Sequence, residues 1–217
     1  MYYVKTKELG VVKCFPRGKL KENGGLFIGD YVDIVVDKEG VIEVLHPRKS
    51  QLVRPYVSNI DGIVIILAPL PKPDMLLADK LIIGAIEQGI TPIVCINKSD
   101  LVGADKVVQE VVSDYEGLAK IIVISAQTGQ GIAQLLQEIS GKYFCLAGQS
   151  AVGKSSLINC IYGEIKMKVG ELSAKGERGQ NTTRHVEILE LDDGTKIADT
   201  CGFNMLEMPL FDPNKLA

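Results

Sequence analysis

The sequence lacks the features of membrane-spanning and secreted proteins. Its longest apolar run, Ile63 to Leu70, is far too short to cross a lipid bilayer. No charged start followed by a hydrophobic segment and a small-residue cleavage site is present, so no secretion signal is predicted. Paired cysteines are also absent: the five cysteines are scattered, without a CxxC motif or metal-ligand spacing. Cys95 and Cys145 lie within apolar runs, where small buried side chains are expected. A reducing cytoplasm is the predicted location.

The composition is that of a globular protein, with 46% hydrophobic and 24% charged residues and room in 217 residues for one ordinary domain and a small one. The net charge of −3 is unevenly distributed. Residues 1–59 carry ten Lys and Arg against seven Asp and Glu, whereas the remainder carries fourteen against twenty. This asymmetry favours the N-terminal part as the binding surface for a polyanion, although a solvated charged face fits the same pattern.

Residues 1–58 are predicted to form a small all-β domain. Clusters of β-forming residues such as Gly10–Cys14, Tyr31–Val36 and Val41–Leu45 are separated by glycine-containing turns, and no helical pattern interrupts them. Five short strands in this length fit an OB-type barrel better than an open sheet, which would leave unpaired edges.

Residues 59–217 are predicted to form an α/β domain with a mostly parallel sheet. Continuous apolar runs such as Ile63–Leu67 indicate strands that helices cover on both faces. Val186–Leu191 and Thr195–Asp199 flank the turn Asp192–Gly194 and are expected to pair as a hairpin. The predicted helices are Asp74–Gly89, Ala104–Glu116, Gly131–Ile139 and Lys154–Tyr162.

A phosphate-binding loop follows the predicted strand Tyr143–Ala147. The loop matches GxxxxGK[ST] and, with the serine after it, comprises Gly148, Gln149, Ser150, Ala151, Val152, Gly153, Lys154, Ser155 and Ser156. The glycines let backbone N–H groups point at a phosphate, and the helix N-terminus adds positive potential. Lys154 is expected to bridge the β- and γ-phosphates, and Ser155 to bind Mg²⁺. The alternative is a glycine-rich turn with an accidental Lys-Ser pair.

The base is predicted from Asn97-Lys98-Ser99-Asp100, which follows the strand Pro92–Ile96 at the carboxyl edge of the sheet. The Asp100 carboxylate can accept hydrogen bonds from guanine N1–H and the exocyclic amine, a pair of donors that adenine does not offer. Such readout rejects the wrong base because a mismatch leaves buried polar groups unpaired. Lys98 is expected to lie along the base and Asn97 to tie loops together.

A second motif supports guanine. Ser125-Ala126 follows the strand at Lys120 and supplies the backbone N–H that guanine O6 needs. On its own, the Asn97 motif could be a turn with a helix cap. Asn97, Asp100 and Ala126 together disfavour an ATP-using enzyme.

Two further pieces complete the expected set. Asp199 and Gly202 form a DxxG motif at the end of the last strand, where the aspartate holds Mg²⁺ through water and the glycine N–H senses the γ-phosphate. Thr182 and Thr183 lie in a polar loop, and a threonine there completes the Mg²⁺ shell. Either hydroxyl could serve; Thr183 is favoured.

The order of these motifs is unusual. Base-recognition loops come last in ordinary GTPases, but here they precede the phosphate loop. A short join at Gly141-Lys142 replaces the usual ends of the domain, so the sequence predicts a circularly permuted GTPase.

The order of the motifs, the barrel-like N-terminus and three further segments all match one known protein family, over essentially the whole chain. The segments are Arg48–Pro55, Asn59–Asp61 and Arg178-Gly179 before the paired threonines. The sequence resembles the ribosome small-subunit-dependent GTPase A family, which are bacterial assembly factors for the 30S particle. The resemblance implies an OB barrel that touches ribosomal RNA and slow GTP hydrolysis that the small subunit stimulates in late 30S maturation. It also implies GTP or GDP and Mg²⁺ as ligands.

We expect a monomer without DNA or membrane partners. The family's C-terminal zinc module is expected beyond Ala217, and no residue of this sequence is predicted to bind zinc. A GTP-dependent RNA-binding module with negligible hydrolysis is the alternative function.

The catalytic group is the least determined part. Lys154 and Thr183 are expected to act on the phosphates, but Phe203 after Gly202 cannot hydrogen-bond water as a glutamine would. The resembling family usually has a histidine where Asn181 stands, and a proline where Cys201 stands. Asn181 can orient water but cannot take up a proton near neutral pH. His185 could substitute, although a surface histidine that opens a strand explains it as well.

The N-terminal domain is expected to meet RNA through a basic loop. Its residues are Lys13, Arg17, Lys19 and Lys21, with Phe15 as a stacking surface among them. A solvated hairpin tip is the alternative.

Overall fold

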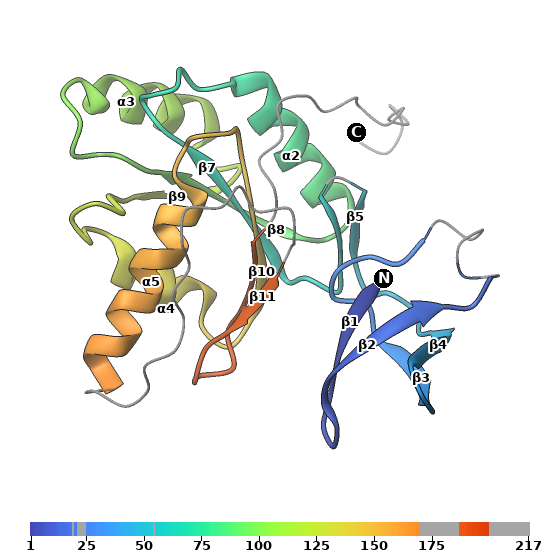
Figure 1. Cartoon of the computed structure of the whole chain (residues 1–217). Coiled ribbons are helices and arrows are strands. Elements are labelled where there is room, and N and C mark those ends of the chain that lie inside the picture. Colours follow the sequence, from blue (N-terminus) through green and yellow to red (C-terminus); the bar gives the residue numbers. More distant parts are fainter. Residues whose placement is uncertain (19, 21–24, 54, 170–186, 200–217) are drawn as a thin grey trace. The chain divides into compact units, whose positions relative to one another are not determined.

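The computed structural model describes residues 1–18, 20, 25–53, 55–169 and 187–199. The chain divides into two compact units, Met1–Asn59 and Ile60–Ala217. Figure 1 shows strands alone labelled in the first unit and a sheet flanked by helices in the second. Among these residues no helix is long and apolar enough to span a bilayer.

The N-terminal unit is built mainly from strands, with helical backbone described at Gly18 and Leu20. Four strands form one sheet in the order β1-β2-β4-β3, in which β1 and β2 pair antiparallel and β2 and β4 pair parallel. Two three-residue strands form a separate antiparallel hairpin. The described strands are β1 (Tyr2–Thr6), β2 (Gly10–Pro16), β3 (Val32–Val36), β4 (Gly40–Leu45), β5 (Gln51–Val53) and β6 (Tyr56–Ser58). The unit thus contains six described strands where the sequence predicted five.

An almost buried ion pair holds this unit together. The Arg48 guanidinium donates to both carboxylate oxygens of Asp30, at 2.7 and 2.8 Å, and lies 3.9 Å from the centre of the Phe27 ring. Ser58 Oγ donates to the same carboxylate at 2.6 Å. Removing either partner would leave the other charge buried and unpaired, so we expect Arg48 and Asp30 to be needed for the stability of this unit.

The predicted basic loop is partly a strand. Lys13 and Phe15 lie within β2, with the Lys13 ammonium 5.5 Å from the centre of the Phe15 ring. Arg17 follows β2 and pairs with Glu43 of β4 at 3.1 Å. Lys19 and Lys21 lie outside the described residues. The prediction of a loop is therefore wrong for Lys13 and Phe15, because β2 continues to Pro16 through its parallel pairing with β4.

The second unit has a six-stranded sheet in the order β11-β12-β10-β7-β8-β9. All neighbours pair parallel except β11 and β12, which form the predicted antiparallel hairpin. Its strands are β7 (Gly62–Leu67), β8 (Thr91–Ile96), β9 (Lys120–Val123), β10 (Tyr143–Ala147), β11 (Glu187–Glu190) and β12 (Lys196–Asp199). Its helices are α2 (Met75–Glu87), α3 (Ala104–Tyr115), α4 (Ile132–Ile139) and α5 (Lys154–Val169).

Helices cover both faces of this sheet, as the continuous apolar strands predicted. Val64 and Ile66 of β7 pack into one core with residues of α4 and α5, whereas Ile63 and Ile65 alternate to the opposite face. α2 packs on β7 and β8 through buried residues such as Leu81. Each face of β7 is thus excluded from water. Helix α5 runs to Val169, beyond the predicted end at Tyr162.

The permutation join is fixed to the β11–β12 hairpin. Gly141 N–H donates to Thr195 Oγ1 at 2.8 Å, and Ser140 Oγ donates to Asp193 at 2.8 Å. Lys196 N–H donates to the carbonyl of Lys142 at 2.9 Å. These bonds position the short connection from α4 into β10.

Candidate nucleotide-binding site

The predicted motifs meet at one edge of the sheet. The strands β7, β8, β9, β10 and β12 are mutually parallel, so their carboxyl ends lie together. The phosphate loop follows β10, the Asn97 and Ser125 motifs follow β8 and β9, and Asp199 ends β12. Parallel sheets of this type bind ligands at this edge.

The phosphate loop needs glycine at two positions. Gly148 has φ 141°, and a Cβ there would lie 2.4 Å from the carbonyl oxygen of Ile66. Gly153 has φ 99°, and a Cβ there would lie 2.3 Å from Asn97 Nδ2. Both conformations are ones that residues with a side chain rarely adopt. The chain therefore wraps closely over the end of β7 before α5 begins at Lys154.

Lys154 is a buried cation within this loop. Its side chain is buried, and Nζ donates to the carbonyl oxygens of Gly148 and Gln149 at 2.8 and 2.7 Å. The ammonium therefore lies inside the curve of the loop, where a phosphate would be enclosed by backbone N–H groups.

Asn97 connects three loops. Its Nδ2 donates to the Val152 carbonyl at 2.9 Å, and its Oδ1 accepts from Ala126 N–H at 3.0 Å. The residue is buried, at 2% exposed. One carboxamide thus fixes the base loop to the phosphate loop and to the Ser125 motif.

Lys98 and Asp100 are held by their neighbours. Lys98 has φ 62°, and its Nζ donates to the carbonyls of Ala151 and Leu70, at 2.8 and 2.7 Å. Ser125 Oγ donates to Asp100 Oδ1 at 2.5 Å, which orients a carboxylate that remains exposed. Ser99 N–H donates to the Ile124 carbonyl at 3.1 Å, which joins the ends of β8 and β9.

The proposed Mg²⁺ ligands are described only in part. Ser155 is exposed in the first turn of α5, and Asp199 ends β12 beside Leu146. Hydroxyl and carboxylate oxygens are the ligands that Mg²⁺ prefers, so these two residues fit the ion. Ser156 is also exposed on α5. Four predicted residues, Asn181, Thr182, Thr183 and Gly202, lie outside the described residues, as does His185.

The cysteines of this unit's core are not reactive groups. Cys95 and Cys145 are fully buried, as predicted. Burial raises the pKa of the Cys95 thiol to about 12 and that of Cys145 further. Both remain thiols at neutral pH, so neither supplies a nucleophile to the site.

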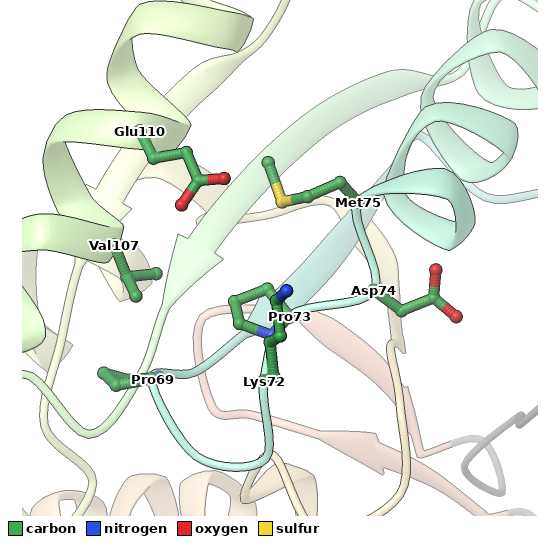
Figure 2. Close-up of a pocket in the computed structure, with 7 residues that line it drawn as sticks. All are labelled: Pro69, Lys72, Pro73, Asp74, Met75, Val107 and Glu110. Carbon is green, nitrogen blue, oxygen red and sulfur yellow. The ribbon is translucent and has the colours of Figure 1, made fainter.

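One segment of the site was not predicted from the sequence. This segment, residues 69–75 between β7 and α2, is hydrogen-bonded to two motif residues. Lys98 Nζ donates to the Leu70 carbonyl, and the Gln149 side chain bonds to the backbone of Lys72 and Asp74. A hollow of about 600 Å³ is lined by residues of this segment and by Val107 and Glu110 of α3. Figure 2 shows these side chains, with the Glu110 carboxylate directed toward Met75. The hollow is lined by none of the predicted site residues, so it flanks the nucleotide loops and does not contain them.

Comparison with known proteins identifies the family. A sequence model described as the RsgA GTPase matches residues 45–209. The small ribosomal subunit biogenesis GTPase RsgA of Caldanaerobacter subterraneus subsp. tengcongensis is 43% identical over 215 residues, which cover 96% of this chain and 72% of that protein. The chain belongs to the RsgA GTPase family.

Other relatives and two solved structures agree. The RsgA of Thermotoga maritima is 36% identical and is covered over 76% of its length by the whole of this chain. The crystal structure of YjeQ from Thermotoga maritima matches with a TM-score of 0.73 and 32% identity, over 99% of this chain and 75% of that one. YloQ, described as a circularly permuted GTPase, matches with a TM-score of 0.64 and 29% identity, over 95% of this chain and 69% of that one. The predicted fold class, a permuted P-loop GTPase domain preceded by an OB-type domain, is confirmed.

Proposed function

We propose that this RsgA-family chain binds GTP and GDP at the carboxyl edge of the second unit and hydrolyses GTP slowly. Hydrolysis is stimulated by the small ribosomal subunit and serves late 30S maturation in the cytoplasm. The observation that carries the proposal is the link between three loops through Asn97. A base loop, a phosphate loop and the Ser125 motif held together in this way have the arrangement that a guanine nucleotide needs.

The roles of the individual residues follow from their contacts. Asp100, oriented by Ser125, reads the guanine edge. The Ala126 N–H, predicted to donate to guanine O6, donates to Asn97 Oδ1 in this structure, so O6 would share or take over that donor when the base binds. Lys154 and the backbone of the phosphate loop stabilise the phosphates. Ser155 and Asp199 would hold Mg²⁺, which would neutralise charge on the phosphates when bound.

Slow intrinsic hydrolysis is expected from the residues around the γ-phosphate. Phe203 follows Gly202 in the sequence, and an aromatic ring cannot orient the attacking water. We propose that Asn181 takes this role in part, with Thr183 completing the Mg²⁺ shell. Turnover well below about 1 s⁻¹ is therefore expected without a partner.

The test is multiple-turnover GTP hydrolysis with and without purified small subunits. We expect a low rate alone, a clear rise with subunits, and loss of both in Lys154→Ala. A rate that small subunits leave unchanged would refute the proposed stimulation. Nucleotide binding without measurable hydrolysis under either condition would instead favour a GTP-dependent RNA-binding module.

The N-terminal unit is the proposed RNA contact. Tyr3 and Lys5 of β1 pair with Lys13 and Val11 of β2, so their side chains and that of Phe15 share one sheet face. All five are exposed, with Tyr3 at 64% and Phe15 at 37%. Aromatic rings between lysines are suited to stacking on bases beside a phosphate backbone.

Salt dependence tests this contact. Small-subunit binding should weaken as salt rises, and the slope should become shallower when Lys5 and Lys13 are both changed to Ala. Tyr31→Ala, an exposed aromatic outside this face, is the matched control and should leave binding unchanged. An unaltered slope in the double variant would refute the contact without affecting the nucleotide site.

A further inference from the structure

We infer that the Gln149 side chain is a positioning residue, which holds the phosphate loop in the shape that accepts a β-phosphate. The inference rests on the proposed nucleotide site and assigns a side chain where the P-loop pattern requires only backbone. It concerns a contact between two parts of the chain that are far apart in the sequence.

The Gln149 carboxamide uses both of its polar groups on main chain. Its Oε1 accepts from Asp74 N–H at 3.1 Å, and its Nε2 donates to the Lys72 carbonyl at 3.2 Å. These partners are 75 and 77 residues away in the sequence. Two bonds to one short segment fix both the position and the direction of the side chain.

The segment that receives Gln149 is itself firmly held. Asp74 caps α2, with Oδ1 accepting from Leu77 N–H at 3.0 Å and the backbone carbonyl accepting from Ala78 N–H at 3.1 Å. Helix α2 is anchored on the sheet by buried residues. Pro73, between the two bonded residues, has a restricted φ. Figure 2 shows Lys72, Pro73 and Asp74 leading directly into the helix.

The other end of the contact lies at the phosphate loop. The backbone carbonyl of Gln149 accepts from Lys154 Nζ at 2.7 Å. Gly148 before it has a conformation that residues with a side chain rarely adopt, and Ser150 and Ala151 after it are exposed. The side chains of Ser150 and Ala151 therefore contribute little packing, although the Ala151 carbonyl accepts from Lys98 Nζ at 2.8 Å. The Gln149 side chain connects this part of the loop to the rigid start of α2, and so fixes the carbonyl that places the lysine.

This role predicts a loss that depends on the phosphates. GDP presents a β-phosphate to the loop, whereas GMP does not. In Gln149→Met, which keeps the length of the side chain but loses both bonds, GDP should bind about 5- to 30-fold more weakly, as expected from two neutral hydrogen bonds. GMP affinity should change by less than about twofold, since the base loop keeps the bonds of Asn97 with Ala126 and of Lys98 with Leu70, which do not involve the phosphate loop.

The experiment is isothermal titration of GDP and GMP into wild-type protein, Gln149→Met, Gln149→Glu and a control. Gln149→Glu keeps the acceptor for Asp74 N–H but places a carboxylate oxygen against the Lys72 carbonyl, so GDP should bind at least as weakly as in Gln149→Met. Gln134→Met, on an exposed position of α4, is the matched control and should behave as wild type.

Three results would overturn the inference. GDP affinity could be unchanged in Gln149→Met, GDP and GMP could weaken by the same factor, or the variant could lose its cooperative urea unfolding without nucleotide. Each would show that the side chain has no role or a general structural one. A wild-type protein that binds no GDP would refute the proposed nucleotide site as well, which distinguishes the two failures.

Discussion

Gly153→Ala is expected to impair base recognition although it lies in the phosphate loop. Gly153 has φ 99°, and the new Cβ would lie 2.3 Å from Asn97 Nδ2. The backbone strain and the loss of the buried bond from Asn97 to the Val152 carbonyl each cost about 1–3 kcal/mol. Displacing Asn97 also breaks the 3.0 Å hydrogen bond that the Ala126 N–H donates to Asn97 Oδ1.

The free variant can relieve both costs by relaxing the loop, and incurs them again when GDP imposes the binding conformation. A cost of at least about 2 kcal/mol on binding lowers GDP affinity about 30-fold or more. Titration of GDP measures this effect, and GMP should weaken as well, since Asn97 holds the base loop. This joint loss distinguishes Gly153→Ala from Gln149→Met, in which GMP binding is kept.

Gly163→Ala, in the helix α5 that follows the phosphate loop, is the matched control. A Cβ at Gly163 would meet nothing within 4 Å, so the change should leave nucleotide affinity unaltered and stabilise the helix by up to about 1 kcal/mol. If Gly153→Ala bound GDP and GMP like wild type, the close approach of Gly153 to Asn97 would have no energetic role and the reasoning would be wrong.

Three further predictions concern the site and the join. Asp100→Asn should weaken GTP and improve xanthosine triphosphate in competition assays, because one acceptor becomes a donor; retained GTP affinity would remove Asp100 from the base site. Lys154→Ala should abolish GTP binding in titrations while leaving thermal unfolding cooperative; an unfolded variant would indicate a structural lysine. Hydrogen bonds from Thr195 lower the pKa of Asp193 below its ordinary value of 3.8, so ionised Asp193 stabilises the fold above that pH. In urea unfolding, the free energy of unfolding should therefore be higher for wild type than for Asp193→Asn. This difference should be constant from pH 7 to about 4 and disappear as the pH falls through the lowered pKa of Asp193. A difference that persisted at lower pH would refute this prediction.

The sequence predicted the second unit well because its signals are local. Continuous apolar strands, a glycine-rich loop before a helix and a polar motif after a strand each indicate structure within a few residues. The parallel sheet then brings the ends of these strands together, so Asn97, Ser125 and Gly148 could be expected at one edge.

Contacts between distant segments could not be predicted in this way. The Gln149 side chain meets Lys72 and Asp74 across more than seventy residues, and no periodicity marks such a pair. The hairpin of β5 and β6 has three residues in each strand, too few for a recognisable alternation. The end predicted for α5 was too early, because an exposed glycine at position 163 weakens a helix without ending it.

The bonds of Asn97 have a consequence for how such a chain can evolve. Its carboxamide joins loops that are 29 and 55 residues apart in the sequence. Since side chains and not the connecting peptide keep these loops together, the order in which the chain visits the strands is not part of the site. Cutting one surface connection and closing another, as at Ser140–Lys142, leaves every one of these bonds in place. Gene rearrangement can therefore change the order of the motifs without passing through an intermediate that has lost its binding site.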